Sequence, residues 1–240
     1  MIFKALAGPN EYLIDHLVEV REKSLEAISK VGLLDSYIIR PLQIAALLHD
    51  IGKSLKFYQN NPSLASKGAF PGHELLSAII SSVILQELKG LSTEEKSIIL
   101  YAVISHHQAM HDIYHRLLGL SNIFSCFEDE GYLRDTFLAI SQYLSLPSNK
   151  ALTLYRKSLK LLLTISNIPK KRSLRRISAF MKQLEFPLNI INNADNITLL
   201  KARLCCALLM LADTYVAMKN RQGEPNSSYR QMILDFFNKR

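Results

Sequence analysis

The chain has 240 residues, 48% of them hydrophobic and 21% charged, a composition typical of a globular protein and not of a disordered one. Its longest apolar runs, such as residues 204–212, are well short of the ~20 residues needed to cross a bilayer, and no signal-peptide pattern opens the chain, so we expect no membrane segment. Three cysteines form neither a CxxC zinc pattern nor a disulfide framework, which excludes a disulfide-stapled scaffold and favours a cytoplasmic protein.

The net charge of +8 is distributed unevenly. Residues 1–149 carry 12 Lys and Arg against 16 Asp and Glu, a net −4, whereas residues 150–240 carry 17 against 5, a net +12. Such asymmetry predicts a basic part that faces a polyanion such as a nucleic acid. A solvated lysine-rich surface explains the same charge, and composition alone favours neither interpretation.

Apolar residues recur at helical spacing nearly throughout the chain. The expected helices are 11–30, 38–53, 73–89, 93–112, 131–145, 150–166, 172–184, 196–219 and 227–238. Ser92 and Glu95 have capping-box spacing, residues 57–72 are rich in loop-forming residues, and no stretch alternates as a strand would. We therefore predict an all-α fold in one domain over residues 1–240, with a basic helical subdomain over 150–240 as an alternative.

The second expected helix ends in a polar motif, His49-Asp50-Ile51-Gly52-Lys53. The imidazole of His49 offers one nitrogen to a metal, while the two oxygens of Asp50 can bridge two metals. Lys53 follows Asp50 by three residues, on a neighbouring part of the helix surface, where it can hold a phosphate. Taken alone, the pair is better explained by a helix-end histidine bonded to its neighbour, and only the rest of the pattern favours a metal site.

Further candidate ligands follow in other predicted helices. His16 shares a helix face with Leu13, Leu17 and Val20, and His73 stands at a helix start. The adjacent pair His106-His107 lies in an apolar helix, where each buried imidazole would need a hydrogen-bond partner. Asp213 ends an apolar run, and a buried carboxylate there is costly unless a metal compensates it.

The order of these residues resembles the HD superfamily of metal phosphohydrolases. The local contexts HDIGKSLKFYQ, GHELLSA, ISHH and LAD are similar to the HD nuclease domain of the CRISPR-associated helicase-nuclease of type I systems. The resemblance covers residues 16 to 213 and implies an all-α HD fold with a di-metal site. The resemblance implies a stand-alone HD nuclease subunit that cleaves DNA. Because base-paired DNA is stiff and a strand must reach the metal pocket one phosphate at a time, we expect single strands to be preferred, and cleavage of RNA is left open.

The resemblance also implies the ligand sets. His16, His49, Asp50 and Asp213 would hold one metal, with His16 either a ligand or just outside the coordination sphere, and Asp50, His73, His106 and His107 would hold the other. Imidazole and carboxylate donors suit Mn, Fe, Co, Ni or Zn better than Mg. Two ions about 3.5–4 Å apart would activate a water and neutralise phosphate charge, with Asp50 and Lys53 as the catalytic residues. The family pattern does not use His111 and His115, which we expect at the surface or outside the ligand set.

Partners are predicted from two further features. The densest basic cluster either binds a nucleic-acid backbone or is a solvated helix start; it consists of Lys170, Lys171, Arg172, Arg175 and Arg176. The chain lacks a GxxxxGK[ST] phosphate loop, because Leu47 occupies the position of its first glycine. We therefore expect a separate CRISPR helicase subunit, and an effector complex, as partners.

Two other functions compete with this interpretation. An HD phosphohydrolase acting on small nucleotides or cyclic dinucleotides would share HDIGK, but the residues after His107 read QAMHDIYHR and lack the Gly-Tyr-Pro signature of the cyclic-dinucleotide class. A non-catalytic nucleic-acid-binding subunit would use the metal only to stabilise its fold. Incubation with polymeric and monomeric substrates separates all three.

Overall fold

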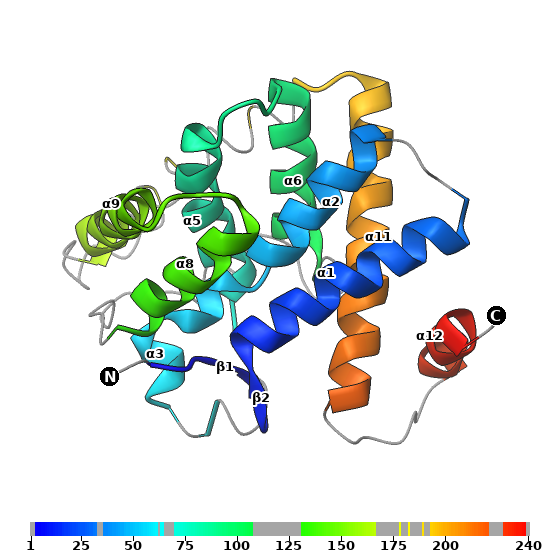
Figure 1. Cartoon of the computed structure of the whole chain (residues 1–240), viewed down its shortest axis with the longest axis horizontal. Helices are drawn as coiled ribbons and strands as arrows, with labels where there is room; N and C mark the ends of the chain where they lie inside the picture. The colour runs from blue at the N-terminus through cyan, green and yellow to red at the C-terminus, as the bar shows by residue number, and fades with distance from the viewer. Residues whose placement is uncertain are drawn as a thin grey trace.

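The predicted all-α architecture is confirmed by a computed structural model (Figure 1). The structure describes residues 3–32, 36–61, 63–64, 70–107, 131–166, 193–220 and 228–238, with the single positions 178, 182 and 189. Its α-helices are α1 (Leu13–Lys30), α2 (Ser36–Leu48), α3 (Lys56–Gln59), α5 (His73–Glu87), α6 (Thr93–Ser105), α8 (Tyr132–Tyr143), α9 (Ser148–Ser166), α11 (Asn196–Asn220) and α12 (Ser228–Asn238). The cluster at 170–176, His111 and His115 lie outside these residues, as does most of the expected helix 172–184.

The core forms where α1, α2, α6 and α11 pack against one another, with α5 on the outer side of α6 (Figure 1). Helix α1 illustrates how an amphipathic helix packs against the core. Its apolar residues Leu13, Leu17 and Val20 recur at helical spacing and are fully buried. Each such side chain contributes about 1.5–3 kcal/mol when it leaves water. His16 lies among them and is equally buried, so α1 inserts a polar ring directly into the apolar core.

The expectation of no strands is wrong at the N-terminus. Strands β1 (Leu6–Gly8) and β2 (Glu11–Tyr12) form a small antiparallel hairpin, so α1 begins at Leu13 and not at residue 11. Strands of three and two residues are too short to show alternation. Asn10 makes the turn with φ of 58°, a left-handed conformation that asparagine tolerates. The side chain of Gln59 holds the hairpin, accepting from Leu6 N–H at 2.8 Å and donating to Leu6 O at 3.0 Å.

The second expected helix is also shorter than predicted. It ends at Leu48, a turn carries His49 and Asp50, and a 3-10 helix, η1 (Ile51–Ser54), follows. Helix α3 then begins at Lys56 and continues into the segment 57–72, which the sequence predicts as a loop. Gly52 explains the change, because a Cβ there would lie 2.5 Å from the His73 carbonyl oxygen. Its N–H donates to Ser77 Oγ at 2.9 Å, so η1 rests directly on the first turns of α5.

Two other local predictions, the capping box and the start of the helix at His73, are confirmed. Ser92 and Glu95 form the expected reciprocal capping box at the start of α6. Helix α5 begins at His73, after Gly72 with a φ of 74°. Cys205 and Cys206 are buried free thiols. None of the described helices is long and apolar enough to cross a membrane.

Candidate metal centre

The structure brings all seven candidate ligands together from five segments of the chain. His16 comes from the first turn of α1, His49 and Asp50 from the turn after α2, and His73 from the first position of α5. His106 and His107 immediately follow α6, and Asp213 comes from α11. They form two groups of four, and within each group the potential ligand atoms all lie within 4.8 Å of one another. The groups are His16, His49, Asp50 and Asp213, and Asp50, His73, His106 and His107.

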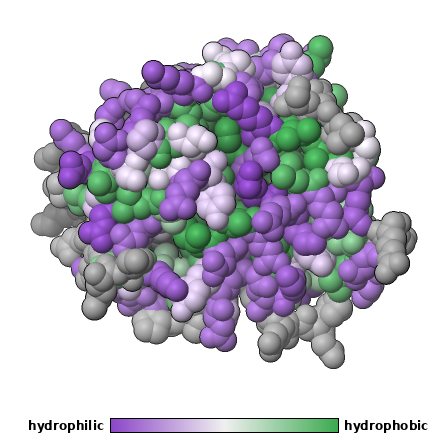
Figure 2. Space-filling view, viewed as in Figure 1, coloured by the Kyte–Doolittle hydropathy of each residue, from purple (hydrophilic) through white to green (hydrophobic). Residues whose placement is uncertain are grey.

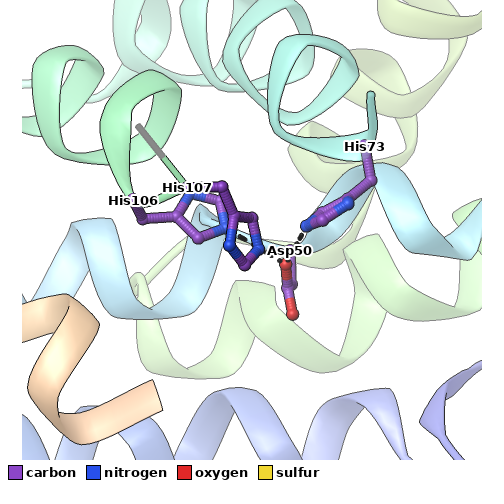
Figure 3. Close-up of side chains that lie close together, drawn as sticks. All are labelled: Asp50, His73, His106 and His107. Atoms are coloured by element: carbon purple, nitrogen blue, oxygen red, sulfur yellow. Dashed lines mark ion pairs between the residues drawn. The ribbon is translucent and has the colours of Figure 1, made fainter. Parts of the chain in front are cut away.

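Asp50 is common to both groups and is fully buried between them. Figure 3 shows its carboxylate facing His73, His106 and His107. Its Oδ1 lies 2.8 Å from His73 Nε2 and 3.5 Å from His106 Nε2. Its Oδ2 lies 3.4 Å from the Nε2 atoms of both His16 and His49. One oxygen therefore faces each group, which is the arrangement that a bridging carboxylate requires.

Asp213 completes the first group from an unexpected position. Its Oδ1 lies 3.1 Å from His16 Nε2 and 3.8 Å from His49 Nε2. The sequence places it at the end of a helix, but α11 continues to Asn220, so Asp213 stands in its interior. The apolar run before it marks the stretch of α11 that packs in the core, and the helix goes on past this run with more polar residues.

One helix prediction near the second group needs the opposite correction, because the helix ends earlier than expected. His106 and His107 are not inside a helix that reaches residue 112, because α6 ends at Ser105 and His106 caps it. Because α6 ends before His106 and His107, these two residues need not follow the regular angular spacing of a helix. Their ring centroids lie 4.2 Å apart, and each also lies within 5.6 Å of the His73 ring.

The far nitrogens of four histidines are fixed by acceptors. His49, His73 and His106 each place Nδ1 against the backbone carbonyl three residues earlier, at 2.8, 2.5 and 2.7 Å. His16 places Nδ1 2.8 Å from Glu11 Oε1. Carbonyl and carboxylate oxygens only accept, so Nδ1 carries the proton and donates, and the Nε2 lone pair of a neutral ring points toward Asp50.

This arrangement leaves acceptors facing acceptors in a buried space. The Nε2 atoms of His16, His49, His73 and His106 and the Oδ1 of Asp50 are buried and have no hydrogen-bond partner. Such atoms are costly in a protein interior unless protons or a cation lie between them. The mixed nitrogen and oxygen donors fit a divalent transition metal, so the residues present match the ions that the sequence implies.

In the first group, protons and a metal ion would compete for the imidazole nitrogens of His16 and His49. Burial by itself lowers the pKa of His16, but hydrogen bonding with Asp213, Asp50 and Glu11 outweighs it and raises that pKa well above 6.5. Burial also opposes protonation of His49, yet the charge of Asp50 and the hydrogen bond with Asp213 raise its pKa to about 9. A divalent ion satisfies the same carboxylates and displaces these protons.

Two histidines of the second group, His106 and His107, stay unprotonated. Burial lowers the pKa of His107 to about 2, helped by the charges of His106 and His73. Burial likewise lowers the pKa of His106, against the hydrogen bond with Asp50. Burial would raise the pKa of Asp50, but the neighbouring charges of His49, Lys53 and His73 lower it well below 3.8. Neutral imidazoles beside an ionised carboxylate are the forms that bind metals.

Lys53 lies directly against the bridging carboxylate. The residue is 5% exposed, and Nζ donates to Asp50 Oδ2 while lying 5.3 Å from the Phe70 ring centroid. The sequence predicts Lys53 on a neighbouring part of an α-helix surface. In the 3-10 geometry of η1, side chains three residues apart lie one above the other. Lys53 therefore lies over Asp50, and its predicted contact with phosphate stays a prediction.

Glu11 is a functional residue that sequence reasoning missed. It is 4% exposed on β2, and its Oε1 accepts from His16 Nδ1 at 2.8 Å and from Asn220 Nδ2 at 2.9 Å. A carboxylate behind a histidine fixes its orientation and increases its basicity toward a metal. The signal in the sequence is slight, since it consists of an acidic residue five positions before His16.

The chain matches the family model described as HD domain over residues 13–144, more than half of its length. The matched segment includes His16, His49-Asp50, His73 and His106-His107, while Asp213 lies beyond it. Neither the curated proteins nor the solved structures compared with the chain gave a match. With the family matched and a buried cluster of histidines and aspartates suited to a divalent metal, the chain belongs to the HD domain family of metal-dependent phosphohydrolases.

Proposed function

We propose that the chain is a nuclease that hydrolyses phosphodiester bonds of DNA in CRISPR interference, together with a separate helicase. The hydrolytic part of the proposal depends on one observation above all. Asp50 is fully buried between two four-donor groups and turns one oxygen toward each of them. This geometry favours two bound ions, which would activate a water and neutralise charge on a phosphate.

The residues of the chain supply the rigid frame for this chemistry. Backbone carbonyls and Glu11 orient four imidazoles, so little reorganisation is needed when a phosphate arrives. Of the seven candidate ligands, His107 and Asp213 are the two that are partly exposed. We propose that the substrate phosphate approaches from their side, while Lys53 contributes a fixed positive charge next to Asp50.

The polymeric substrate is proposed from the charge distribution. Residues 150–240 carry a net +12, which suits a polyanion better than a mononucleotide. The contexts HDIGKSLKFYQ, GHELLSA and ISHH resemble the nuclease partner of a CRISPR helicase. A single strand can present one phosphate at a time to a buried site, so single strands and frayed ends should be cleaved before blunt duplex. Because the chain has no ATP-binding loop of the GxxxxGK[ST] type, ATP should act only once a helicase is added.

The decisive experiment incubates the purified chain and Mn²⁺ with labelled single-stranded DNA, duplex DNA, RNA, a cyclic dinucleotide and nucleoside triphosphates. We expect cleavage of single-stranded DNA that is lost in chelator and in Asp50→Asn. Cleavage should be retained in Asp15→Asn, which removes an exposed carboxylate next to His16 in the chain. Hydrolysis of the small nucleotides alone would assign the chain to the competing phosphohydrolase class. Metal binding without hydrolysis of any substrate would favour a non-catalytic subunit.

A further inference from the structure

A second cavity, separate from the metal centre, lies between α1, α2, the turn from α5 to α6 and the turn from α8 to α9. Its volume is about 560 Å³. Sites for small ligands commonly measure about 300–1,000 Å³, so the cavity has room for one small molecule.

The lining of this cavity is strongly basic. Arg21, Arg40, Lys89 and Lys150 contribute to it, against a single acidic residue, Glu87. The carboxylate of Glu87 is paired with two lysines: Lys157 Nζ donates to its Oε1 at 2.7 Å from outside the cavity, and Lys150 Nζ lies 3.7 Å from its Oε2. Lys150 Nζ also donates to the backbone oxygen of Glu87 at 2.8 Å. The cavity therefore carries net positive charge that suits an anionic ligand.

Arg21 lines the cavity beside an aromatic ring. Its guanidinium lies 6.0 Å from the centroid of the Tyr143 ring. A guanidinium offers several N–H donors in a plane and binds the oxygens of a phosphate well. The guanidinium and the ring thus stand together at one wall of the cavity.

Next to the Tyr143 ring, which is 44% exposed, the cavity has an apolar wall. The residues of this wall are Ile44, Leu47, Leu144 and Leu146. Figure 2 shows hydrophobic surface between hydrophilic side chains on the face in view. A ligand that fits both walls has an anionic end and a flat, weakly polar body, which is the chemistry of a nucleotide.

Helix geometry separates this cavity from the metal centre. The α2 residues that line it, Arg40, Ile44 and Leu47, form one stripe of the helix. His49 continues the helical hydrogen bonding, since its N–H donates to Ala45 O at 2.8 Å. It follows Leu47 by two residues, so it leaves α2 about 200° away from that stripe. The cavity and the metal centre therefore lie on opposite sides of α2.

We propose that this cavity binds a nucleoside 5′-phosphate, either as a free mononucleotide or as the phosphorylated end of a strand. The phosphate contacts Arg21 and Lys150, and the base packs on Tyr143 and the leucines. Binding at this second site needs no metal, so the proposal can be tested independently of the proposed nuclease activity.

The test is calorimetric titration of the whole chain with adenosine 5′-monophosphate in the presence of chelator. We expect binding that weakens about ten-fold or more in Arg21→Gln and in Lys150→Gln. Lys160→Gln is the matched control, because Lys160 is an exposed lysine of the same helix, α9, that does not line the cavity, and its loss should leave affinity unchanged. Tyr143→Leu should weaken binding of the mononucleotide but not of inorganic phosphate, which shows that the base packs on the ring.

Thermal unfolding and circular dichroism of each variant establish that it is folded before its affinity is interpreted. A 5′-phosphorylated oligonucleotide that binds better than its 5′-hydroxyl counterpart, and as well as the mononucleotide, assigns the site to strand ends; preference for the mononucleotide assigns it to the free ligand. No binding of the mononucleotide, binding that Arg21→Gln leaves intact, or tighter binding of an oligoglutamate peptide would overturn the proposal.

Discussion

Glu11→Gln should weaken metal binding at the first group without unfolding the protein. Both partners of the contact are fully or almost fully buried, at 0% and 2% side-chain exposure, so water does not screen the carboxylate from His16. Glutamine keeps an oxygen that can accept from His16 Nδ1, but it removes the negative charge that raises the basicity of the ring. Loss of such a partner typically costs 10–100-fold in metal affinity, and we expect about ten-fold, or about 1.4 kcal/mol, because the acceptor remains.

Glu19→Gln is the matched control. Glu19 Oε2 accepts from the same Asn220 Nδ2, at 3.1 Å, that donates to Glu11 at 2.9 Å, but among the described contacts it has none with His16. Titration with Mn²⁺ or Zn²⁺ followed by calorimetry measures the affinity of each variant. A larger loss in Glu11→Gln than in Glu19→Gln is the expected result. Equal affinities in the two variants would refute the role given to Glu11.

Three further predictions concern pH, packing and charge. The pKa of His49 is raised to about 9 in the folded metal-free chain against about 6.5 when unfolded, so the stability from its proton is full below about 6.5 and is lost as the pH rises through about 9. Because a metal displaces that proton, the increase in melting temperature caused by Mn²⁺ should grow between these pH values; a constant increase would contradict it. Gly52→Ala should cost about 1–3 kcal/mol in a denaturant titration, because its Cβ would meet the His73 carbonyl oxygen at 2.5 Å, whereas Gly32→Ala, with open space around it, should cost only what its φ of 69° imposes. Alanine at all five basic positions of the 170–176 cluster should weaken DNA binding and flatten its salt dependence, and unchanged binding would make the cluster a solvated surface; the positions are Lys170, Lys171, Arg172, Arg175 and Arg176.

The sequence predicts the helices well where the signal is local, and there it also finds candidate ligands that the structure brings together. His49, Asp50 and Gly52 belong to one short motif, and His73 follows a glycine at a helix start. Each of these predictions therefore depends on only a few neighbouring residues. The α1 face is also predictable, because Leu13, His16, Leu17 and Val20 repeat at helical spacing. Such patterns survive folding because each element buries the face that its own sequence makes apolar.

The predictions fail where tertiary contacts decide the backbone. The helix to residue 53 breaks because Gly52 packs onto the His73 carbonyl from another part of the chain, which no local pattern shows. The hairpin that presents Glu11 is held by the side chain of Gln59, about fifty residues away in sequence. Asp213 is misplaced for a different reason, since an apolar run reports burial and not the end of a helix.

The metal centre closes long loops of the chain. His16 and Asp213 lie 3.1 Å apart at Nε2 and Oδ1, although they are separated by most of the sequence. Their contact joins α1 to α11, and Asp50 links both to α5 and the end of α6 through His73 and His106. An ion bound by these groups therefore holds together the helices that form the core, and no single element can form the site by itself. Because such a site does not exist in the unfolded chain, the free energy of metal binding adds to the stability of the whole bundle.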